Sequence, residues 1–450
     1  MQYVEILPPV CPSPHQFASL PYPCRPNVFL GLIPASTHRP SMFPPLFFRI
    51  EVRPFLAGLH RYLGLLLAGF LCLAGLTGTL LVFHHEIDAA LNPSWFRAPQ
   101  RNQVRLDADA LAQAVSVQMP GSRLDLIYLD AAPGESIRIR LKSRDKMGQP
   151  VMSEAFLDPY DGRLLGVRQE GVLIWDRVHV MPLVFRLHQQ LLISPPTGKW
   201  VTGAVALLWL LHSLTGFYLT LPRNRPFWSR WRQVWRVKRG ASRARLEMDL
   251  HRAGGLWCWA LLVMLAFSAV YLNLRKEVFI PAISWLSTPT PPVIEQTSLQ
   301  MTSFQPRLNY TQAIATGHAQ LPRSEIRYRL RYVQYLPERG AYRLAFEETE
   351  HDKAAKAVRF EQLLIDADTG DVLASRSYDR GTFADRLMAW QFPLHSGQVF
   401  GWPGRIVIAL SGLLITLLSA TGLLIWLRKR RVVSRRHPLP LLRNSRSFSC

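Results

Sequence analysis

The stretches LHRYLGL at residues 59–65 and LHRAGGL at residues 250–256 decide how this chain is organised. Each stretch opens a long apolar run, so one helix beginning occurs twice. A second matching pair, LHQQLLISPPTGKW at residues 187–200 and LHSGQVFGWPGR at residues 394–405, precedes two further apolar runs. Each half of the chain therefore has the order helix, intervening segment, histidine, helix. The sequence predicts an internal duplication.

The apolar runs indicate a membrane protein. They cover about residues 55–83, 200–221, 253–274 and 404–427, and about 20 residues suffice for a helix to cross a bilayer. Only 19% of the residues are charged, against about 25% in ordinary soluble domains. Four membrane helices in two repeats are therefore expected, with a lipid membrane as one partner.

The basic charge of the chain is concentrated in two stretches. Lys and Arg number 53 against 31 Asp and Glu, a formal net charge of +22, which by itself raises the question of nucleic-acid binding. The cations gather at residues 223–245 and 428–436, beside apolar runs, and such clusters mark the cytoplasmic side of a membrane. We therefore expect both termini to be cytoplasmic, both long intervening segments to lie outside, and no nucleic-acid partner.

The motifs of several other protein classes are absent. Five cysteines form no C-x-x-C pair, and no G-x-G-x-x-G, G-x-x-x-x-G-K-[ST], H-E-x-x-H or G-x-S-x-G sequence occurs. These absences argue against a zinc site, a nucleotide fold and a hydrolase. Residues 1–53 are rich in proline and are interpreted as a disordered or artefactual extension, with Met42 as an alternative start.

The intervening segments match each other in pattern. Each has a helix-like stretch, then alternating strands, then a hairpin: AFLDPYDGRLLGVR in the first and QLLIDADTGDVLASR in the second. Each predicts a small α+β domain without a catalytic cluster. The expected fold is an α-helical integral membrane protein with four transmembrane helices in two parallel repeats and two small α+β outer domains. The expected sections are an extension (1–53), a first helix (54–84), a first outer domain (85–187), a histidine segment with a second helix (188–221), a basic loop (222–251), a third helix (252–274), a second outer domain (275–394), a histidine segment with a fourth helix (395–427) and a basic tail (428–450).

This arrangement resembles the PepSY-associated transmembrane family. The matching residues are the L-H-R-x-x-G-L helix starts, the hairpins D-P-x-D-G-R-L and D-A-D-T-G-D-V-L, L-T-G near the ends of the first two spans, and A-T-G-L-L-I-W-L-R-K-R-R closing the fourth. Members include iron-regulated inner-membrane proteins and haem-containing reductases of ferric siderophores. The resemblance implies PepSY-like domains in the bacterial periplasm, an inner-membrane location and b-type haem.

The repeated histidines are the candidate haem ligands. An approximate two-fold axis along the membrane normal would place His60 opposite His251 near the cytoplasmic side and His188 opposite His395 near the outer side. Two imidazoles on one haem have the same two-fold relation, so two haems b are expected. The alternative is that these histidines only form hydrogen bonds between helices. His212 has no partner, since Leu418 occupies its place in the second half, whereas His84 or His85 could replace an outer ligand.

Four cations lie near these histidines in the sequence. They could pair with haem propionates, or they could be interfacial anchors that extend to lipid headgroups. They are Arg61 and Arg252 beside the inner histidines, and Lys199 and Arg405 near the outer ones.

Three functions are compatible with this sequence. The leading hypothesis is a haem-dependent reductase that takes electrons from a quinol or a cytoplasmic donor and reduces a ferric siderophore or another ferric chelate outside the membrane. The second is a PepSY protein that binds peptides or restrains a peptidase, without redox activity. The third, a transport component for chelated iron, is disfavoured because the spans show no sequence sign of helix breaks.

Overall fold

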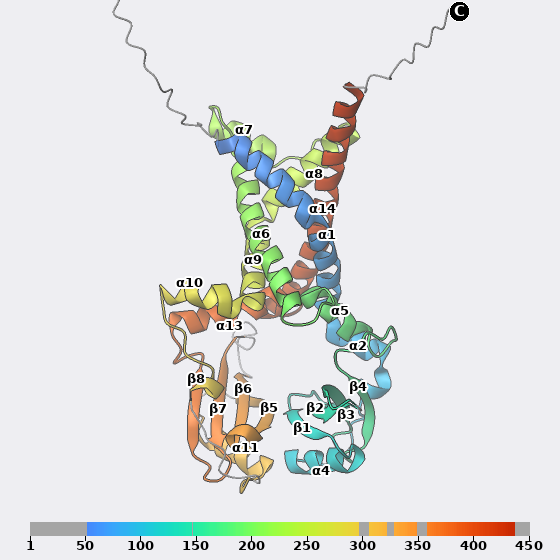
Figure 1. Cartoon of the computed structure of the whole chain (residues 1–450), viewed down its shortest axis with the longest axis vertical. Coiled ribbons are helices and arrows are strands. Elements are labelled where there is room, and N and C mark those ends of the chain that lie inside the picture. Colours follow the sequence, from blue (N-terminus) through green and yellow to red (C-terminus); the bar gives the residue numbers. More distant parts are fainter. Residues whose placement is uncertain (1–51, 146, 297–305, 322–327, 349–357, 437–450) are drawn as a thin grey trace, which may run out of the picture. The chain divides into compact units, whose positions relative to one another are not determined.

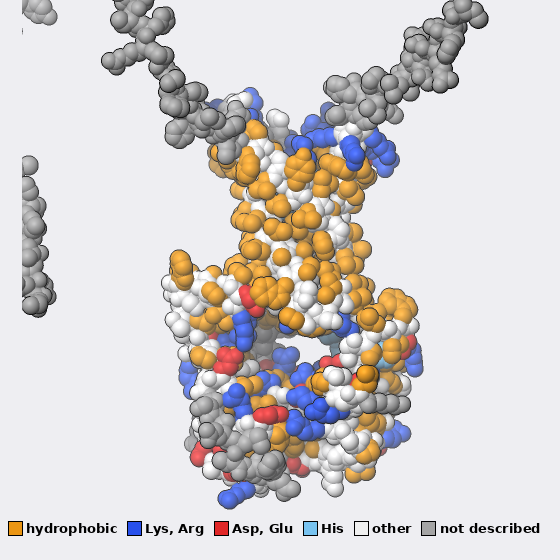
Figure 2. All heavy atoms as spheres, in the orientation of Figure 1, with side chains coloured by type: hydrophobic (Ala, Val, Ile, Leu, Met, Phe, Trp, Pro, Cys, Tyr) orange, Lys and Arg blue, Asp and Glu red, His pale blue; other side chains and the backbone are white. Residues whose placement is uncertain are grey.

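The computed structural model describes residues 52–145, 147–296, 306–321, 328–348 and 358–436 (Figure 1). Nearly all of the expected extension at 1–53, and the tail from residue 437, lie outside these residues. Three described helices are long and apolar enough to cross a membrane: α1 (Val52–Leu81), α6 (Thr197–Thr220), and α14 (Gly401–Arg436) together with the short η4 (Gln398–Phe400) before it. Figure 2 shows hydrophobic side chains covering the surface of these helices, as lipid contact requires.

The expected third transmembrane helix is instead a bent pair. Residues 243–273 form α8 (Arg243–Trp257) and α9 (Trp259–Asn273), whose axes differ by 69°. Gly254 and Gly255 weaken the helix just before the bend, and Cys258 leaves helical geometry with φ −107° and ψ 12°. The prediction of unbroken spans was therefore wrong at this position.

Contacts at the helix ends show that both halves run in the same direction. At one end, Arg53 of α1 donates to the Leu221 carbonyl after α6 at 2.7 Å, and Arg428 of α14 contacts Glu247 of α8 at 2.8 Å. At the other end, Arg405 of α14 reaches α2 (His84–Leu91), just after α1. The Thr202 hydroxyl of α6 likewise donates to Asn273 of α9 at 2.9 Å. Together, α8 and α9 thus connect the same two ends as the three long helices.

The strands overturn the expected fold. The prediction of four transmembrane helices with two separate small α+β domains is wrong, because strands of both halves form one eight-stranded antiparallel sheet in the order β4-β3-β2-β1-β5-β6-β7-β8. The halves join through β1 and β5, with Ile127 opposite Val333 and Tyr128 opposite Tyr332. The strands are β1 (Arg123–Tyr128), β2 (Ile137–Arg144), β3 (Pro150–Leu157), β4 (Leu164–Gln169), β5 (Tyr328–Leu336), β6 (Ala341–Glu348), β7 (Phe360–Asp366) and β8 (Val372–Ser377).

One hydrophobic core serves both halves of the sheet. Helices α4 (Ala108–Gln118) and α11 (Tyr310–Ala319) cover one face, and Leu111 and Ile127 of the first half share a cluster with Leu344 of the second. The carboxylate of Asp109 in α4 also accepts hydrogen bonds from two backbone N–H groups that begin α11, at 2.9 and 2.8 Å. One continuous core therefore spans both halves of the sheet.

The two predicted hairpins are present at equivalent places. In the turn from β3 to β4, Gly162 has φ +69°, and in the turn from β7 to β8, Gly370 has φ +81°. The side chains of Asp158 and Asp366 each accept a backbone N–H two residues later, at 2.9 and 2.8 Å. An aspartate that closes the turn and a glycine free to adopt positive φ explain both motifs.

Short elements connect helices and sheet with matching ion pairs. Arg168 of β4 binds Asp88 of α2 at 2.7 Å, and Arg376 of β8 binds Asp385 of α13 (Phe383–Ser396) at 2.8 Å. All four side chains are largely buried. The remaining elements are α3 (Pro93–Phe96), α5 (Val180–Gln190), α7 (Phe227–Val234), η1 (Arg275–Phe279), α10 (Ile280–Ser284), η2 (Val293–Glu295) and η3 (Pro337–Arg339).

The crossing of α1 and α14 depends on two glycines in contact. A Cβ added at Gly75 would lie 2.7 Å from the Thr416 hydroxyl and against the Gly412 carbonyl. Gly75→Ala should therefore cost about 1–3 kcal/mol by overpacking and lower the unfolding temperature measured in detergent. Gly69→Ala on the same helix is the matched control, because no atom lies within 4 Å of its added Cβ. Equal unfolding temperatures for the two variants would contradict a tight crossing at Gly75.

Candidate functional site

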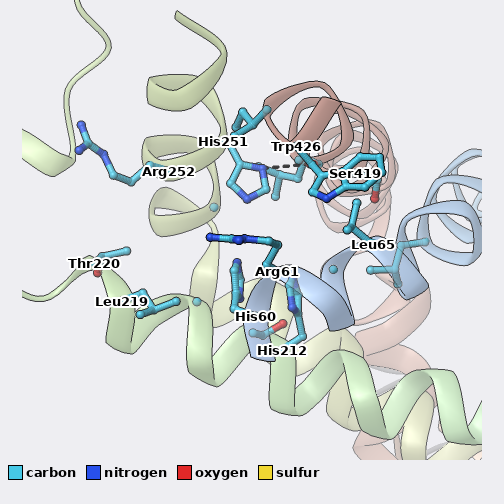
Figure 3. Close-up of a pocket in the computed structure, with 18 of the residues that line it drawn as sticks. His60, Arg61, Leu65, His212, Leu219, Thr220, His251, Arg252, Ser419 and Trp426 are labelled. Carbon is cyan, nitrogen blue, oxygen red and sulfur yellow. Dashed lines mark hydrogen bonds between the residues drawn. The ribbon is translucent and has the colours of Figure 1, made fainter. Parts of the chain in front are cut away.

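Three histidines meet at one end of the helices. His60 of α1 and His251 of α8 have ring centroids 6.5 Å apart, and His212 of α6 stacks on His60 at 3.9 Å with an interplanar angle of 5°. These rings line a cavity of about 760 Å³ together with Arg61 and Arg252. Figure 3 shows the imidazoles of His60 and His251 facing each other across this cavity, with the Arg61 guanidinium between them in the view.

His212 is a member of this cluster that repeat matching did not place. It was expected to have no partner because the second half carries Leu418 at its position. The structure instead puts it directly against His60, and its Nδ1 is buried without a hydrogen-bond partner. The sequence contains one indication of this position. In LHSLTG, His212 lies three residues before Thr215, less than one helical turn away, and Thr215 is the residue that contacts His60.

A second pair lies at the opposite end of the helices. His188 of α5 and His395 of α13 also have ring centroids 6.5 Å apart, with an interplanar angle of 62°. Burial lowers the pKa of His188. Burial together with the neighbouring His188 lowers the pKa of His395 to about 4. Both imidazoles are therefore neutral near pH 7, the form in which histidine binds metals.

Every member of the two repeated pairs has its Nδ1 occupied by a hydroxyl group. The partner is a threonine or serine from the same half of the chain, at 2.8–3.3 Å: Thr215 for His60, Thr421 for His251, Thr77 for His188 and Ser268 for His395. His251 Nδ1 also contacts the Leu418 carbonyl at 3.0 Å. An Nδ1 held in this way fixes the orientation of the ring, as it does in ligating histidines.

Glycines after the threonines make room for the rings. An added Cβ would lie 2.9 Å from the His60 ring at Gly216 and 3.2 Å from the His251 ring at Gly422. At Gly78 it would lie 3.2 Å from His188. In the sequence, the T-G pairs serve only as markers of the family resemblance. Their structural role is that the threonine holds a ring and the glycine lets it approach the helix.

The other candidate outer ligands lie elsewhere. His85 contacts Glu135 at 3.1 Å through Nε2, and exposed His84 contacts the Leu81 carbonyl at 3.1 Å through Nδ1. His188 and His395 therefore lie beside each other, while His84 and His85 contact other groups.

The four candidate cations differ in their surroundings. Arg61 and Arg252 line the inner cavity, and Arg252 is paired with Asp249 at 3.0 Å. Arg405 forms an ion pair with Glu86 through two contacts of 2.6 Å and also donates to the Val82 carbonyl. Lys199 is exposed at the start of α6. Arg61 and Arg252 are therefore the cations placed to meet a negatively charged group in the inner cavity.

The spacing of the imidazole rings can be compared with that of two histidines on one metal ion. The described residues contain no group of three or more His, Cys, Asp or Glu side chains with the arrangement of a metal site. Two imidazoles whose metal bonds are each about 2 Å long on opposite sides of one ion have ring centres about 6 Å apart. Both observed separations are 6.5 Å.

Comparison with known proteins places the chain in a family. Residues 57–429 match the model of the PepSY-associated TM region, a stretch that includes all the histidines of both clusters. A search of curated proteins finds no match. Because the family model matches most of the chain and the long helices are apolar enough to span a bilayer, this protein is a membrane protein that belongs to the PepSY-associated transmembrane family.

Proposed function

We propose that this protein is a di-haem reductase of the bacterial inner membrane that passes electrons across the membrane to a periplasmic ferric chelate, such as a siderophore. The observation that supports it most is the equal 6.5 Å spacing of two imidazole pairs at opposite ends of the helices. An isolated polar ring among apolar helices is costly. Two matched pairs, each with both Nδ1 atoms held by a hydroxyl group, favour ligation over simple bonding between helices.

The residues present fit haem b at the inner pair. His60 and His251 would hold the iron, and Arg61 and Arg252 would pair with the propionates in the 760 Å³ cavity. Such a cavity has the size of typical cofactor sites, about 300–1,000 Å³. At the outer pair, His188 and His395 would hold a second haem. The haems would supply reversible one-electron transfer between the two sides.

The protein has four tasks in this reaction. The hydroxyls of Thr215, Thr421, Thr77 and Ser268 orient the four rings. The neutral form of His188 and His395 keeps Nε2 available for iron. The apolar helices keep water from the path between the pairs, and the outer segments would dock the chelate.

Electrons and protons balance without a covalent step on the protein. A quinol that releases two electrons and two protons reduces two ferric ions to ferrous ions, and a cytoplasmic one-electron donor reduces one. Fe(II) binds hard oxygen donors less tightly than Fe(III), so the chelate releases its iron after reduction. A docking surface and an electron path are sufficient for this reaction.

The proposal can be tested by absorption spectra of protein purified in detergent from cells supplied with haem. The wild type should show the bands of low-spin b-type haem, which shift on reduction with dithionite. Each of His60→Ala, His251→Ala, His188→Ala and His395→Ala should remove about half of the haem, because each removes one of the two histidines that would hold the haem at one site.

His84→Ala and His85→Ala are the matched controls and should keep both haems, since His85 contacts Glu135 and His84 contacts Leu81. A colourless wild type would reject the reductase and favour the peptide-binding alternative. Full haem content in any of the four ligand variants would remove that histidine from the assignment.

The hydroxyls that hold the rings give a second prediction. Thr77→Val keeps the shape of the side chain but removes the hydroxyl 2.9 Å from His188 Nδ1. Haem affinity at the outer site should fall about 10- to 100-fold, with a shifted midpoint potential in redox titration. Thr79→Val, two residues away and bonded to the Gly75 and Ala409 carbonyls, should leave that potential unchanged. An unchanged potential in Thr77→Val would show that its hydroxyl does not position the ligand.

The orientation is part of the proposal. The basic residues 223–245 follow α6, and the basic residues 428–436 close α14. Both stretches lie at the end of the helices where Arg53 contacts Leu221 and Arg428 contacts Glu247. The positive-inside rule places this end in the cytoplasm. Alkaline phosphatase, active only in the periplasm, should be active when fused after residue 146 and inactive when fused after residue 436. Activity of the second fusion alone would reverse the proposed orientation.

A further inference from the structure

The middle of the sheet carries two matching pairs of an aromatic ring and a cation. Tyr128 lies directly across from Tyr332 where the halves meet, with ring centroids 6.4 Å apart in an edge-to-face arrangement. The Arg138 guanidinium lies 4.8 Å from the Tyr128 ring centre, and that of Arg343 lies 5.3 Å from the Tyr332 ring centre. Each half supplies one tyrosine and one arginine. We call these four residues the Tyr–Arg platform.

The platform lies on the face of the sheet opposite α4 and α11. Ile137 and Ile139 of β2 enter the core under those helices, so the alternating Arg138 and Arg140 point to the other face. That face is covered by apolar contacts toward both ends of the sheet: Trp95 of α3 packs on Phe156 of β3, and η2 packs against β7 and β8. The middle strands between them carry charged side chains instead, and Figure 2 shows Lys and Arg gathered over the strands.

Carboxylates lie close to most of the cations around the platform. Asp125 contacts Arg140 at 2.8 Å and Lys142 at 2.6 Å. Burial alone would raise the pKa of Asp125, but hydrogen bonds from these cations and from Gln334 hold it below its usual value, so the carboxylate stays charged. Arg138 has a looser contact with Glu154 at 3.5 Å.

Arg343 differs from these cations. Within the part of the chain that the structure describes, its guanidinium contacts the Tyr332 ring and makes no ion pair with a carboxylate, and its Nε is buried without a hydrogen-bond partner. Arg343 is half-buried, so an anion could reach its guanidinium and form charge-assisted hydrogen bonds with it. Cross-strand tyrosines stacked with arginine contribute to stability, and Arg343 also carries a charge that no described carboxylate pairs.

We propose that the Tyr–Arg platform binds an anionic ferric chelate with catecholate donors. This inference rests on the proposed function and names the substrate class of the reductase. A ferric tris-catecholate complex has three negative charges and flat aromatic donors, which match two guanidinium groups and two tyrosine rings. A neutral ferric trihydroxamate offers neither the charge nor the aromatic rings, so the platform selects against it.

Binding of two chelates to the full-length protein, purified in detergent from cells supplied with haem, tests the proposal, with no reductant present. The probes are the trianionic iron(III) complex of a hexadentate tris-catecholamide and the neutral iron(III) complex of a hexadentate trihydroxamate, measured by equilibrium dialysis. Arg138→Gln and Arg343→Gln should each raise the Kd of the catecholate about tenfold, and the double variant about a hundredfold. Affinity for the neutral complex should stay unchanged in all three.

The control variant removes the same charge elsewhere on the sheet. Arg163 is exposed in the turn before β4, and Arg163→Gln should bind the catecholate like the wild type. Arg343→Lys keeps the charge but loses the flat guanidinium, so it should lose part of the affinity. It also remains informative if the glutamine variants do not fold. Wild-type affinity in a folded Arg343→Gln, or equal losses in Arg163→Gln, would overturn the proposal.

The haem spectrum separates failure of the platform from failure of the reductase. A haem-containing protein whose catecholate binding ignores Arg138 and Arg343 would overturn the platform and leave the reductase standing. A colourless protein that binds the catecholate through both arginines would reject the reductase, while the platform would stand as a binding site.

Discussion

The contact between a histidine Nδ1 and a hydroxyl group is the constraint on which the helical part depends. A ring without such a contact could rotate, and its second nitrogen would have no fixed direction. Thr77 and Ser268 occupy equivalent places in the two repeats, as do Thr215 and Thr421. The helices must therefore approach closely where these residues lie, and glycines such as Gly216 and Gly422 permit that approach. In both halves, a hydroxyl residue that orients the ring and a nearby glycine that lets the helices approach thus determine ring orientation and helix packing together.

The sequence predicts the helical part better than the sheet because the two parts obey constraints of different range. Apolar runs, basic clusters and the L-H-R repeat are local patterns, and they correctly indicate long apolar helices in a membrane protein. Strand pairing between halves depends on contacts across about 200 residues, such as Tyr128 with Tyr332. The hairpin motifs were recognised, but nothing local shows that β1 pairs with β5. Two separate domains were therefore predicted where one sheet exists.

The candidate site shows the same division between residue types and geometry. Duplication correctly brought His60 toward His251 and His188 toward His395. It could not place His212, because a residue found in only one half has no counterpart to match. It also could not show that Arg405 forms an ion pair with Glu86, since that contact joins residues far apart in the chain. Comparison of the two repeats predicts only the contacts that both halves make, and it cannot predict contacts made by one half alone.

The pairing of β1 with β5 gives this single chain the architecture of a symmetric dimer. Two copies of a single half, related by the same axis, would complete an eight-stranded sheet and both imidazole pairs, much as a two-fold interface does between subunits. A covalent link frees each half to change alone. His212 against Leu418, and Gly78 against Ala269, are such changes. The fusion thus allows the two ends of the molecule to acquire different chemistry, which identical subunits could not.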